Sequence, residues 1–338
     1  MALSIGINGF GRTGRQVYKA IRRYYNDTLN VVAVNDIGNL DTMTYLLKYD
    51  TNYGHFPGDV SATKEGFIAD GQAVKVFAEK DPANIPWGKL GVEIVVESSG
   101  HFTQAEKAKA HLHAGAKKVI ISAPGKGEDI TIVLGVNEAM YDPARHHIIS
   151  NASCTTNGLA PVAKVLFHTF GIEKGLLTTV HAYTNSQRLL DLEAKEPRDA
   201  RAAAMNIVPS ETGAARAIGL VIPQLKGKFS GMAFRVPVSA VSVIDFTALL
   251  SRTVTVADIN SSMKGYAEGS MKGILGYTEE PLVSSDLKGD SRSSIFSALD
   301  TLVIGDNLVK VVAWYDNEWG YAVRVADLAR YVGEKRTR

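Results

Sequence analysis

Near its start the chain reads Ser4-Ile5-Gly6-Ile7-Asn8-Gly9-Phe10-Gly11-Arg12-Thr13-Gly14, an apolar run that passes directly into a glycine-rich turn. Residues 15–25 then follow a helical apolar pattern, and a second apolar run, 29–34, leads to Asp36. Strand, glycine turn, helix, strand and acid in this order are typical of a dinucleotide-binding βαβ unit, although a plain tight turn is the alternative interpretation. The glycines would let the backbone approach a pyrophosphate at the helix N-terminus, and Asp36 would accept hydrogen bonds from the ribose hydroxyls.

The first half of the chain continues this alternation of strand and helix patterns. Its apolar runs are rich in Val and Ile and lack strict alternation, which is typical of parallel strands covered on both faces. We therefore expect an α/β fold with a Rossmann-type doubly wound parallel sheet. The expected strands are 4–8, 29–35, 92–97, 118–122, 130–134 and 147–150, the expected helices are 11–25, 40–49 and 105–114, and a hairpin is expected over 66–76.

The second half has longer, alternating strand patterns, which predict an α+β catalytic domain with a mixed or antiparallel sheet. Its expected strands are 175–182, 232–236, 242–250 and 308–315, and its expected helices are 158–170, 213–221, 256–268 and 317–332. We expect the last helix to pack on the first domain. The predicted dinucleotide-binding domain is therefore discontinuous, over 1–153 and 317–338, and the predicted catalytic domain covers 154–316.

The chain has 338 residues, of which 45% are hydrophobic and 21% charged, and its net charge is +2. This length suffices for two domains with their own cores. The small net charge argues against a primary nucleic-acid partner, and no apolar run approaches the length of a membrane span. No signal peptide is expected, and a single cysteine excludes an internal disulfide framework, so we expect a cytoplasmic protein. The histidine pairs, His111 with His113 and His146 with His147, lack the partners of a zinc site, so we expect surface residues there and no metal.

Cys154, the only cysteine, lies in Ser-Asn-Ala-Ser-Cys-Thr-Thr-Asn at 150–157. The strand pattern before it and the helical pattern after it, 158–170, predict a thiol at a strand-to-helix turn. The positive end of a helix favours thiolate over thiol. A lone cysteine is more often a small buried apolar residue, but the hydroxyl and amide neighbours on both sides favour a reactive thiol here.

His181 ends the strand pattern 175–182 and is followed by Tyr183-Thr184-Asn185. A lone histidine is more often a structural side chain than a catalytic one. A cysteine nucleophile, however, needs a base, and imidazole titrates near neutral pH. We therefore predict that His181 is catalytic, and that its charged form lowers the pKa of the Cys154 thiol.

Five segments carry a resemblance to a known family. They are Ile-Asn-Gly-Phe-Gly-Arg at 7–12, Ser-Asn-Ala-Ser-Cys-Thr-Thr-Asn at 150–157, Val-Pro-Ser-Glu-Thr-Gly-Ala-Ala at 208–215, Phe-Arg-Val-Pro at 234–237 and Trp-Tyr-Asp-Asn-Glu-Trp-Gly-Tyr at 314–321. In this order and spacing, over essentially the whole chain, the sequence resembles glyceraldehyde-3-phosphate dehydrogenase. The resemblance implies glycolytic oxidation of glyceraldehyde 3-phosphate to 1,3-bisphosphoglycerate, with hydride transfer to NAD and inorganic phosphate as the second substrate.

The resemblance also implies the roles of individual residues. Cys154 would attack the aldehyde, His181 would take the hydroxyl proton, and phosphate would cleave the resulting thioester. The backbone N–H of Cys154 would stabilise the oxyanion. The implied cofactor-binding residues are Gly9, Gly11, Arg12, Thr13, Asp36, Lys80, Ser122, Asn317 and Tyr321. The residues implied to bind the two phosphate groups are Ser153, Thr155, Thr184, Thr212, Gly213 and Arg235.

Some of these roles have alternatives. Thr155 and Thr212 could equally serve as helix caps, and the tryptophans of 314–321 could form an aromatic seam between domains. For the cofactor, Asp36 favours NAD because its carboxylate repels the 2′-phosphate of NADP. Relatives that use both cofactors tend to follow this acid with threonine and to carry serine in the long loop, where this chain has Ile37 and Glu193. NADP, alone or together with NAD, is the alternative cofactor.

Other functions also remain as alternatives. Oxidation of erythrose 4-phosphate or reduction of an acyl phosphate fits less well, because Tyr183-Thr184-Asn185 after His181 resembles the triose-phosphate enzyme more closely. A non-enzymatic RNA-binding or redox role is possible only as a secondary one. The long charged segment 186–208 has little periodicity, which is typical of a functional or intersubunit loop, and the resemblance implies a homotetramer.

Overall fold

The first sheet is built around β1 (Leu3–Asn8) in the computed structural model, which describes residues 2–335. The other strands of this sheet are β2 (Leu29–Asn35), β5 (Val60–Ala62), β6 (Gly66–Ala69), β7 (Gln72–Phe77), β8 (Ile94–Glu97), β9 (Lys118–Ile121), β10 (Ile130–Thr131) and β11 (Ile148–Ser150). Their order is β10-β11-β9-β8-β1-β2-β7-β6-β5. β1 pairs in parallel with both β2 and β8, so the strand order reverses at β1. In doubly wound sheets a dinucleotide binds beyond the carboxyl ends of the strands at such a reversal.

Helices α1 (Arg12–Tyr24), α2 (Leu40–Lys48) and α3 (Ala105–His113) connect the parallel strands of this sheet. The hairpin of β6 and β7 turns through Asp70 and Gly71, which both have positive φ, as a two-residue hairpin turn of this sequence requires. The other short elements between α2 and β8 are β3 (Tyr49–Asp50), β4 (Gly54–His55) and the 3₁₀ turn η1 (Pro82–Asn84). The predicted doubly wound parallel sheet is confirmed.

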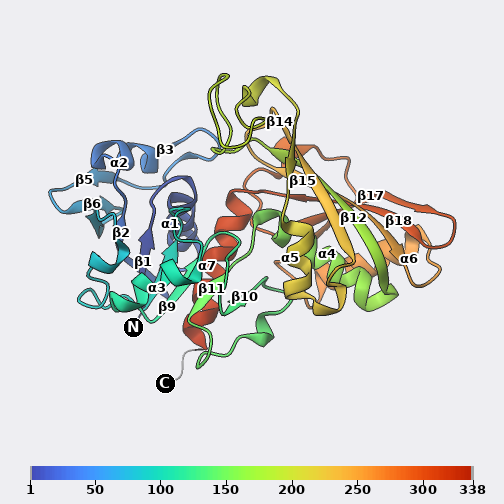
Figure 1. Ribbon diagram of the computed structural model, residues 1–338, viewed down its shortest axis with the longest axis horizontal. Helices are drawn as coiled ribbons and strands as arrows, with labels where there is room; N and C mark the ends of the chain where they lie inside the picture. Colours follow the sequence, from blue (N-terminus) through green and yellow to red (C-terminus); the bar gives the residue numbers. More distant parts are fainter. Residues whose placement is uncertain (1, 336–338) are drawn as a thin grey trace. The chain divides into compact units, whose positions relative to one another are not determined.

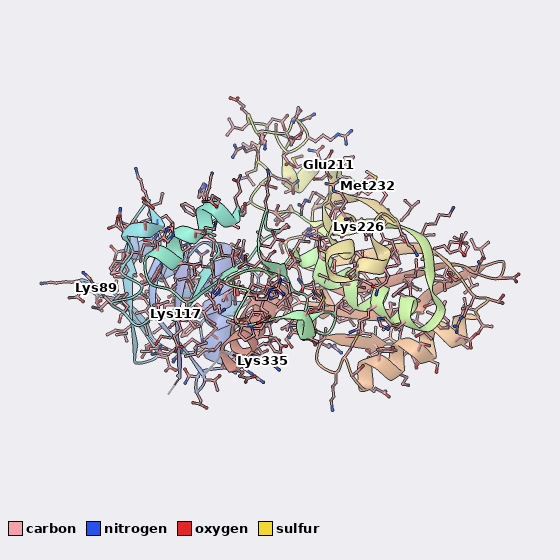
Figure 2. The ribbon with its side chains drawn as sticks, turned by 60° about the horizontal axis from the view of Figure 1, so that its bottom comes forward. Lys89, Lys117, Glu211, Lys226, Met232 and Lys335 are labelled. Atoms are coloured by element: carbon pink, nitrogen blue, oxygen red, sulfur yellow. The ribbon has the colours of Figure 1, made fainter. Side chains whose placement is uncertain are left out.

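The second sheet is mixed, as the alternating patterns predicted. Its strands are β12 (Ile172–Ala182), β13 (Val208–Glu211), β14 (Phe229–Val236), β15 (Ser242–Leu250), β16 (Leu275–Thr278), β17 (Ser294–Ile304) and β18 (Leu308–Tyr315). Their order is β13-β14-β12-β15-β18-β17-β16. β12 pairs in parallel with β14 and antiparallel with β15. At the edge, Glu211 of β13 lies opposite Met232 of β14, and Figure 2 labels both.

Helices α4 (Cys154–Phe170), α5 (Ala214–Val221) and α6 (Val256–Glu268) lie along the second sheet (Figure 1). The segment 186–207 contains only the 3₁₀ turn η3 (Ala203–Met205), and it projects beyond β14 as a yellow-green loop in Figure 1. The other 3₁₀ turns are η2 (Glu138–Met140), η4 (Pro223–Leu225) and η5 (Ser284–Leu287). The last helix, α7 (Trp319–Glu334), buries a row of small apolar side chains, among them Ala322, Val325 and Ala329.

By their internal contacts the residues form two units, one of 2–132, 139–152 and 322–335, the other of 133–138 and 153–321. The sequence predicted domains over 1–153 with 317–338 and over 154–316. The units therefore place residues 133–138, 153 and 317–321 differently from that division, and the functional domain boundaries stay a prediction. Met1 and residues 336–338, which belong to the predicted first domain, lie outside the described residues.

Six strands were not predicted: the short strands β3, β4 and β5, and three strands of the second sheet, each of which departs from a regular strand pattern. β13 is an edge strand that contains Pro209, and β16 is a four-residue strand that contains Gly276. In β17 the pairing with β18 shifts register between Ser297 and Leu302, so the alternation of apolar residues is interrupted there. α4 also begins four residues earlier than the predicted helix 158–170, because Ser153 caps it.

Candidate active site

The turn between β1 and α1 is shaped by its glycines. Gly9 has a φ of +87°, and a Cβ at Gly9 would lie 2.4 Å from the backbone N of Ser99. A Cβ at Gly14 would lie 2.1 Å from the carbonyl oxygen of Gly9. A Cβ at Gly11, in contrast, would meet no atom within 4 Å, and no side chain caps the N-terminus of α1, which begins after Gly11. This open, positively polarised helix end fits the pyrophosphate of a dinucleotide.

Asp36 follows β2 and is held against this turn. Its Oδ2 accepts the backbone N–H of Phe10 at 2.7 Å, and its Oδ1 accepts the N–H of Gly38 at 2.9 Å. Each carboxylate oxygen has further lone pairs, so both can still accept from the hydroxyls of an adenosine ribose. The two bonds fix the Asp36 carboxylate beside the glycine turn, and its binding of the ribose stays a prediction.

The other predicted cofactor residues of the first unit have different surroundings. Arg12 donates to the buried carboxylate of Asp50 at 2.6 Å, which fixes the guanidinium and holds the pKa of Asp50 below its usual value although burial opposes this. Ser122 donates its hydroxyl to the carbonyl oxygen of Glu97 at 3.1 Å. Thr13 is partly exposed at the start of α1, and Lys80 is exposed.

A buried polar network under the same turn was not predicted, and it contains His111, so the expectation of a surface position for His111 was wrong. Glu97, at the carboxyl end of β8, accepts from Asn8 at 2.5 Å and from Nε2 of His111 at 2.9 Å. The indole N–H of Trp87 points at Nδ1 of His111 at 3.1 Å. Because indole can only donate, Nδ1 accepts and the proton of neutral His111 sits on Nε2. The other oxygen of Glu97 accepts the N–H and the hydroxyl of Ser99, next to Gly9, so the network supports the glycine turn.

Sequence reasoning missed this network because its members lie far apart in the chain and none belongs to a known motif. The only signal was the polar residue at the end of each strand pattern, Asn8, Asn35 and Glu97. Asn35 donates to the side-chain oxygen of Asn8 at 2.7 Å, so the carboxyl ends of all three strands are joined.

Cys154 is the first residue of α4 and is partly buried. The hydroxyl of Ser153 accepts the N–H of Thr156 at 3.0 Å, so Ser153 is the N-cap of the helix. Thr155 is buried, and its hydroxyl lies 2.9 Å from that of Tyr315, which in turn lies 2.8 Å from the hydroxyl of Thr179. Both residues predicted beside Cys154 as phosphate ligands thus have structural hydrogen bonds, and their roles toward phosphate stay predictions.

The second unit brings Cys154 and His181 together. The Sγ of Cys154 lies 3.4 Å from Nε2 of His181, within hydrogen-bond distance for sulfur. His181 is buried at the end of β12, and its ring packs edge-on against Tyr315 with centroids 5.9 Å apart. Arg235 lies directly opposite His181 on β14, with its Nη1 2.7 Å from the other ring nitrogen, Nδ1.

The protonation states differ from the sequence-based expectation. Burial raises the pKa of the Cys154 thiol, and the nearby Arg235 and the hydrogen bonds at the helix start only partly offset this. Burial, and then the charge of Arg235, lower the pKa of His181 to about 3. At neutral pH the pair is therefore a neutral thiol beside a neutral imidazole. These pKa directions run against the expected thiolate beside a charged histidine, because desolvation opposes the effect of the helix N-terminus, and the charged pair stays a prediction.

Three predicted phosphate residues lie on loops of the second unit. The hydroxyl of Thr184 lies 3.0 Å from that of Ser186, and its backbone N–H is bonded to Gln187. The hydroxyl of Thr212 accepts the N–H of Ala214, the first residue of α5, at 3.2 Å, although the N-cap residue of α5 is Gly213. Gly213, the residue before α5, is exposed. Their binding of phosphate stays a prediction.

Asn317 and Tyr321 are buried residues of the second unit. The hydroxyl of Ser242 donates to the side-chain oxygen of Asn317 at 3.0 Å and accepts the backbone N–H of Ala182 at 3.0 Å. Ser242 therefore links the strand that carries His181 to the predicted carboxamide ligand. The sequence did not reveal Ser242, since a serine at the start of a strand has no distinguishing pattern.

Comparison with known proteins agrees with this geometry. Residues 3–105 match the family model described as "Glyceraldehyde 3-phosphate dehydrogenase, NAD binding domain", and residues 153–317 match its C-terminal domain. The chain belongs to the glyceraldehyde-3-phosphate dehydrogenase family. Among its relatives, the glyceraldehyde-3-phosphate dehydrogenase of Geobacillus stearothermophilus is 56% identical over 335 residues, which cover 99% of both chains. Glyceraldehyde-3-phosphate dehydrogenase 1 of Bacillus subtilis is 55% identical over 99% of both chains. The NAD-binding domain of this family and the turn around Gly11 together identify the cofactor as NAD.

Two further observations concern what the described residues contain. Within 2–335, no helix has the length and apolar character that crossing a membrane requires. In the same range, no three His, Cys, Asp or Glu side chains come together as a metal site would need.

Proposed function

We propose that this member of the glyceraldehyde-3-phosphate dehydrogenase family oxidises glyceraldehyde 3-phosphate with NAD and inorganic phosphate to 1,3-bisphosphoglycerate. The observation that carries the proposal is the 3.4 Å approach of Cys154 Sγ to His181 Nε2 at the start of α4. A nucleophile beside a base is the arrangement that covalent catalysis of acyl transfer requires. NAD, when bound, supplies the hydride acceptor.

The residues of the second unit would act in three steps. The sulfur of Cys154 bonds to the aldehyde carbon, and the thiol proton ends on the carbonyl oxygen, which gives a hemithioacetal. Nε2 of His181 then takes the hydroxyl proton while the C–H hydrogen leaves as hydride, so that a thioester remains. Finally a phosphate oxygen displaces the sulfur, which regains a proton, and the acyl phosphate leaves. Backbone N–H groups at the start of α4 favour the oxyanions formed in the first and third steps.

Arg235 is the cation that would hold the phosphate group of the substrate. It is partly buried, and among the described residues it has no carboxylate within ion-pair distance and no hydrogen-bond partner for its Nε. A guanidinium in this condition favours a phosphate oxyanion. Thr184 would add a hydroxyl donor, while Ser153, Thr155, Thr212 and Gly213 would serve the inorganic phosphate.

The loop 186–207 supports a proposed homotetramer. Its side chains Leu189 and Met205 are 80% and 81% exposed in the single chain, and Leu190, Leu192 and Ile207 are exposed as well. Apolar side chains gathered on a projecting loop are typical of a surface that another subunit covers. Light scattering at micromolar concentration should give four times the mass of the chain, and a monomer would contradict the assembly. We propose the cytoplasm as its location, since Cys154 must stay reduced.

Steady-state kinetics tests the reaction. NADH formation from glyceraldehyde 3-phosphate should require inorganic phosphate for sustained turnover, because phosphate removes the acyl group from Cys154. Erythrose 4-phosphate is the comparison substrate, and its kcat/KM should be lower. Equal or faster oxidation of erythrose 4-phosphate would overturn the choice of substrate, and turnover independent of phosphate would overturn the choice of acyl acceptor.

A further inference from the structure

Nδ1 of His181 lies beside one hydrogen-bond acceptor and one hydrogen-bond donor, which favour opposite protonation states of this nitrogen. The carbonyl oxygen of Ala182 lies 2.7 Å from Nδ1, and Nη1 of Arg235 also lies 2.7 Å from Nδ1. Nη1 lies 3.4 Å from the same carbonyl oxygen, so the three atoms form a tight triangle. The parallel pairing of β12 with β14, which sets His181 opposite Arg235, produces this arrangement.

A neutral imidazole cannot satisfy both neighbours at once. A guanidinium has only donors, and a carbonyl oxygen is only an acceptor. If Nδ1 carries the proton, it bonds to Ala182 and its N–H opposes the N–H of Arg235. If Nδ1 has the lone pair, it accepts from Arg235 and the lone pair opposes the oxygen of Ala182. The position of Arg235 therefore decides which tautomer is favoured.

The choice of tautomer matters at the opposite ring nitrogen. Nε2 faces Cys154 Sγ at 3.4 Å and is the atom that would take the hydroxyl proton. It can accept a proton only when the ring proton sits on Nδ1. With Arg235 bonded to Nδ1, the ring proton sits on Nε2, and His181 can donate toward Cys154 but cannot act as a base.

We propose that Arg235 is a positioning residue that holds His181 in the inactive tautomer until a phosphate ester takes its guanidinium. When the oxyanion draws Nη1 away, Nδ1 gains a proton from water and bonds to Ala182, while Nε2 loses its proton to water, so no net proton is taken up. Recognition of the substrate's phosphate group thereby makes His181 a base. This inference rests on the proposed function, since it requires a substrate with a phosphate ester.

The available contacts of Arg235 make this movement feasible. Its Nε is buried and has no hydrogen-bond partner among the described residues, so leaving His181 breaks no ion pair and offers Nε a phosphate oxygen. The charge of Arg235 is also one reason for the low pKa of His181, and moving it onto an anion lessens that effect. When an aldehyde without a phosphate group binds, Arg235 stays on His181. The ring proton then remains on Nε2, and His181 cannot act as a base.

Nitrogen NMR of histidine-labelled protein tests the tautomer directly. His181→Asn identifies the His181 signals among those of the 8 histidines. The ligand-free protein should show protonated Nε2 and unprotonated Nδ1. Saturation with glycerol 3-phosphate, which has the ester but no aldehyde, should exchange the two signals, whereas glycerol should leave them unchanged. Protonated Nδ1 in the ligand-free protein, or no exchange with glycerol 3-phosphate bound, would overturn the proposal.

Substitution supplies a second readout. Arg235→Ala should show the Nδ1-protonated tautomer without any ligand, and Arg252→Ala, on an exposed arginine of the same unit, should behave as wild type. With unphosphorylated glyceraldehyde, Arg235→Ala should have a kcat several-fold above wild type even though its KM for glyceraldehyde 3-phosphate rises. If His181 of the Arg235→Ala variant kept its ring proton on Nε2, as in wild type, Arg235 would not control the tautomer. If that variant does not fold, the titration of wild type with glycerol 3-phosphate still decides. Turnover of glyceraldehyde 3-phosphate by wild type, measured separately, tests the proposed function independently.

Discussion

The Asp36 carboxylate accepts the backbone N–H of Phe10 across 2.7 Å, which ties the end of β2 to the glycine turn after β1. The same bond that shapes the turn also orients the group that would meet the adenosine ribose. The side chain of Asp36 thus joins the predicted pyrophosphate end of the cofactor site to its predicted ribose end.

Replacement of Asp36 by Ala should narrow the preference for NAD over NADP. The variant loses charged hydrogen bonds to the ribose, each worth about 1.5–3 kcal/mol, so kcat/KM for NAD should fall by about 10- to 100-fold. The value for NADP should change much less, because the carboxylate no longer repels the 2′-phosphate. Asp41→Ala, on an exposed residue nearby, is the control. Wild-type enzyme that used NADP as well as NAD would contradict this role of Asp36.

Cys154→Ser should abolish turnover and leave NAD binding almost unchanged. Serine is far less nucleophilic at neutral pH, so kcat should fall by about 10³-fold or more. Steady-state NADH formation measures the loss, and calorimetric titration with NAD measures binding. Substantial remaining dehydrogenase activity would show that the reaction does not run through this thiol.

His181→Asn should make the protein less sensitive to acid. The folded state keeps the pKa of His181 at about 3 against the ordinary 6.5, so between these values the unfolded chain binds a proton that the folded protein does not. The free energy of unfolding is not reduced by His181 above pH 6.5. It decreases as the pH falls below 6.5, because protons then bind to the unfolded chain. At pH 5 the loss is about 2 kcal/mol. Urea unfolding at pH 7 and pH 5 should show a smaller drop for His181→Asn than for His113→Asn, and equal drops would contradict the neutral buried imidazole.

His111→Leu should destabilise the first unit far more than His113→Leu. Leucine leaves the indole N–H of Trp87 and the carboxylate of Glu97 each without one partner, which costs about 2–4 kcal/mol. His113 is an exposed residue of the same helix, and its replacement should change the free energy of unfolding by about 0.5 kcal/mol or less. Chemical unfolding of both variants measures the difference. A similar loss in both would mean that the network adds no stability.

Much of the fold followed from local patterns. β2, β15, β18 and α6 begin and end at the predicted residues, because each has clear apolar periodicity and turn-forming residues beside it. β17 escaped prediction because its irregular pairing interrupts the pattern. Periodicity reports which face of a strand is buried, and a shift of register removes that signal.

Residues of the candidate site that belong to a sequence motif could be predicted. Properties of the site that arise only from tertiary contacts could not. Cys154 and His181 stood out by residue type and neighbours, and they lie within hydrogen-bond distance. Their protonation states, however, depend on burial and on Arg235, which only the pairing of β12 with β14 brings to His181. Ser242 has no sequence signal at all, because its role consists of two contacts across the sheet.

The placement of α7 sets the order in which the molecule can be completed during synthesis. Residues 322–335, which complete the first unit, are made after residues 153–321, which form most of the second unit. The first unit, although most of it is made earlier, is therefore completed only when its last segment is made. The incomplete first unit is therefore the species that a chaperone can bind.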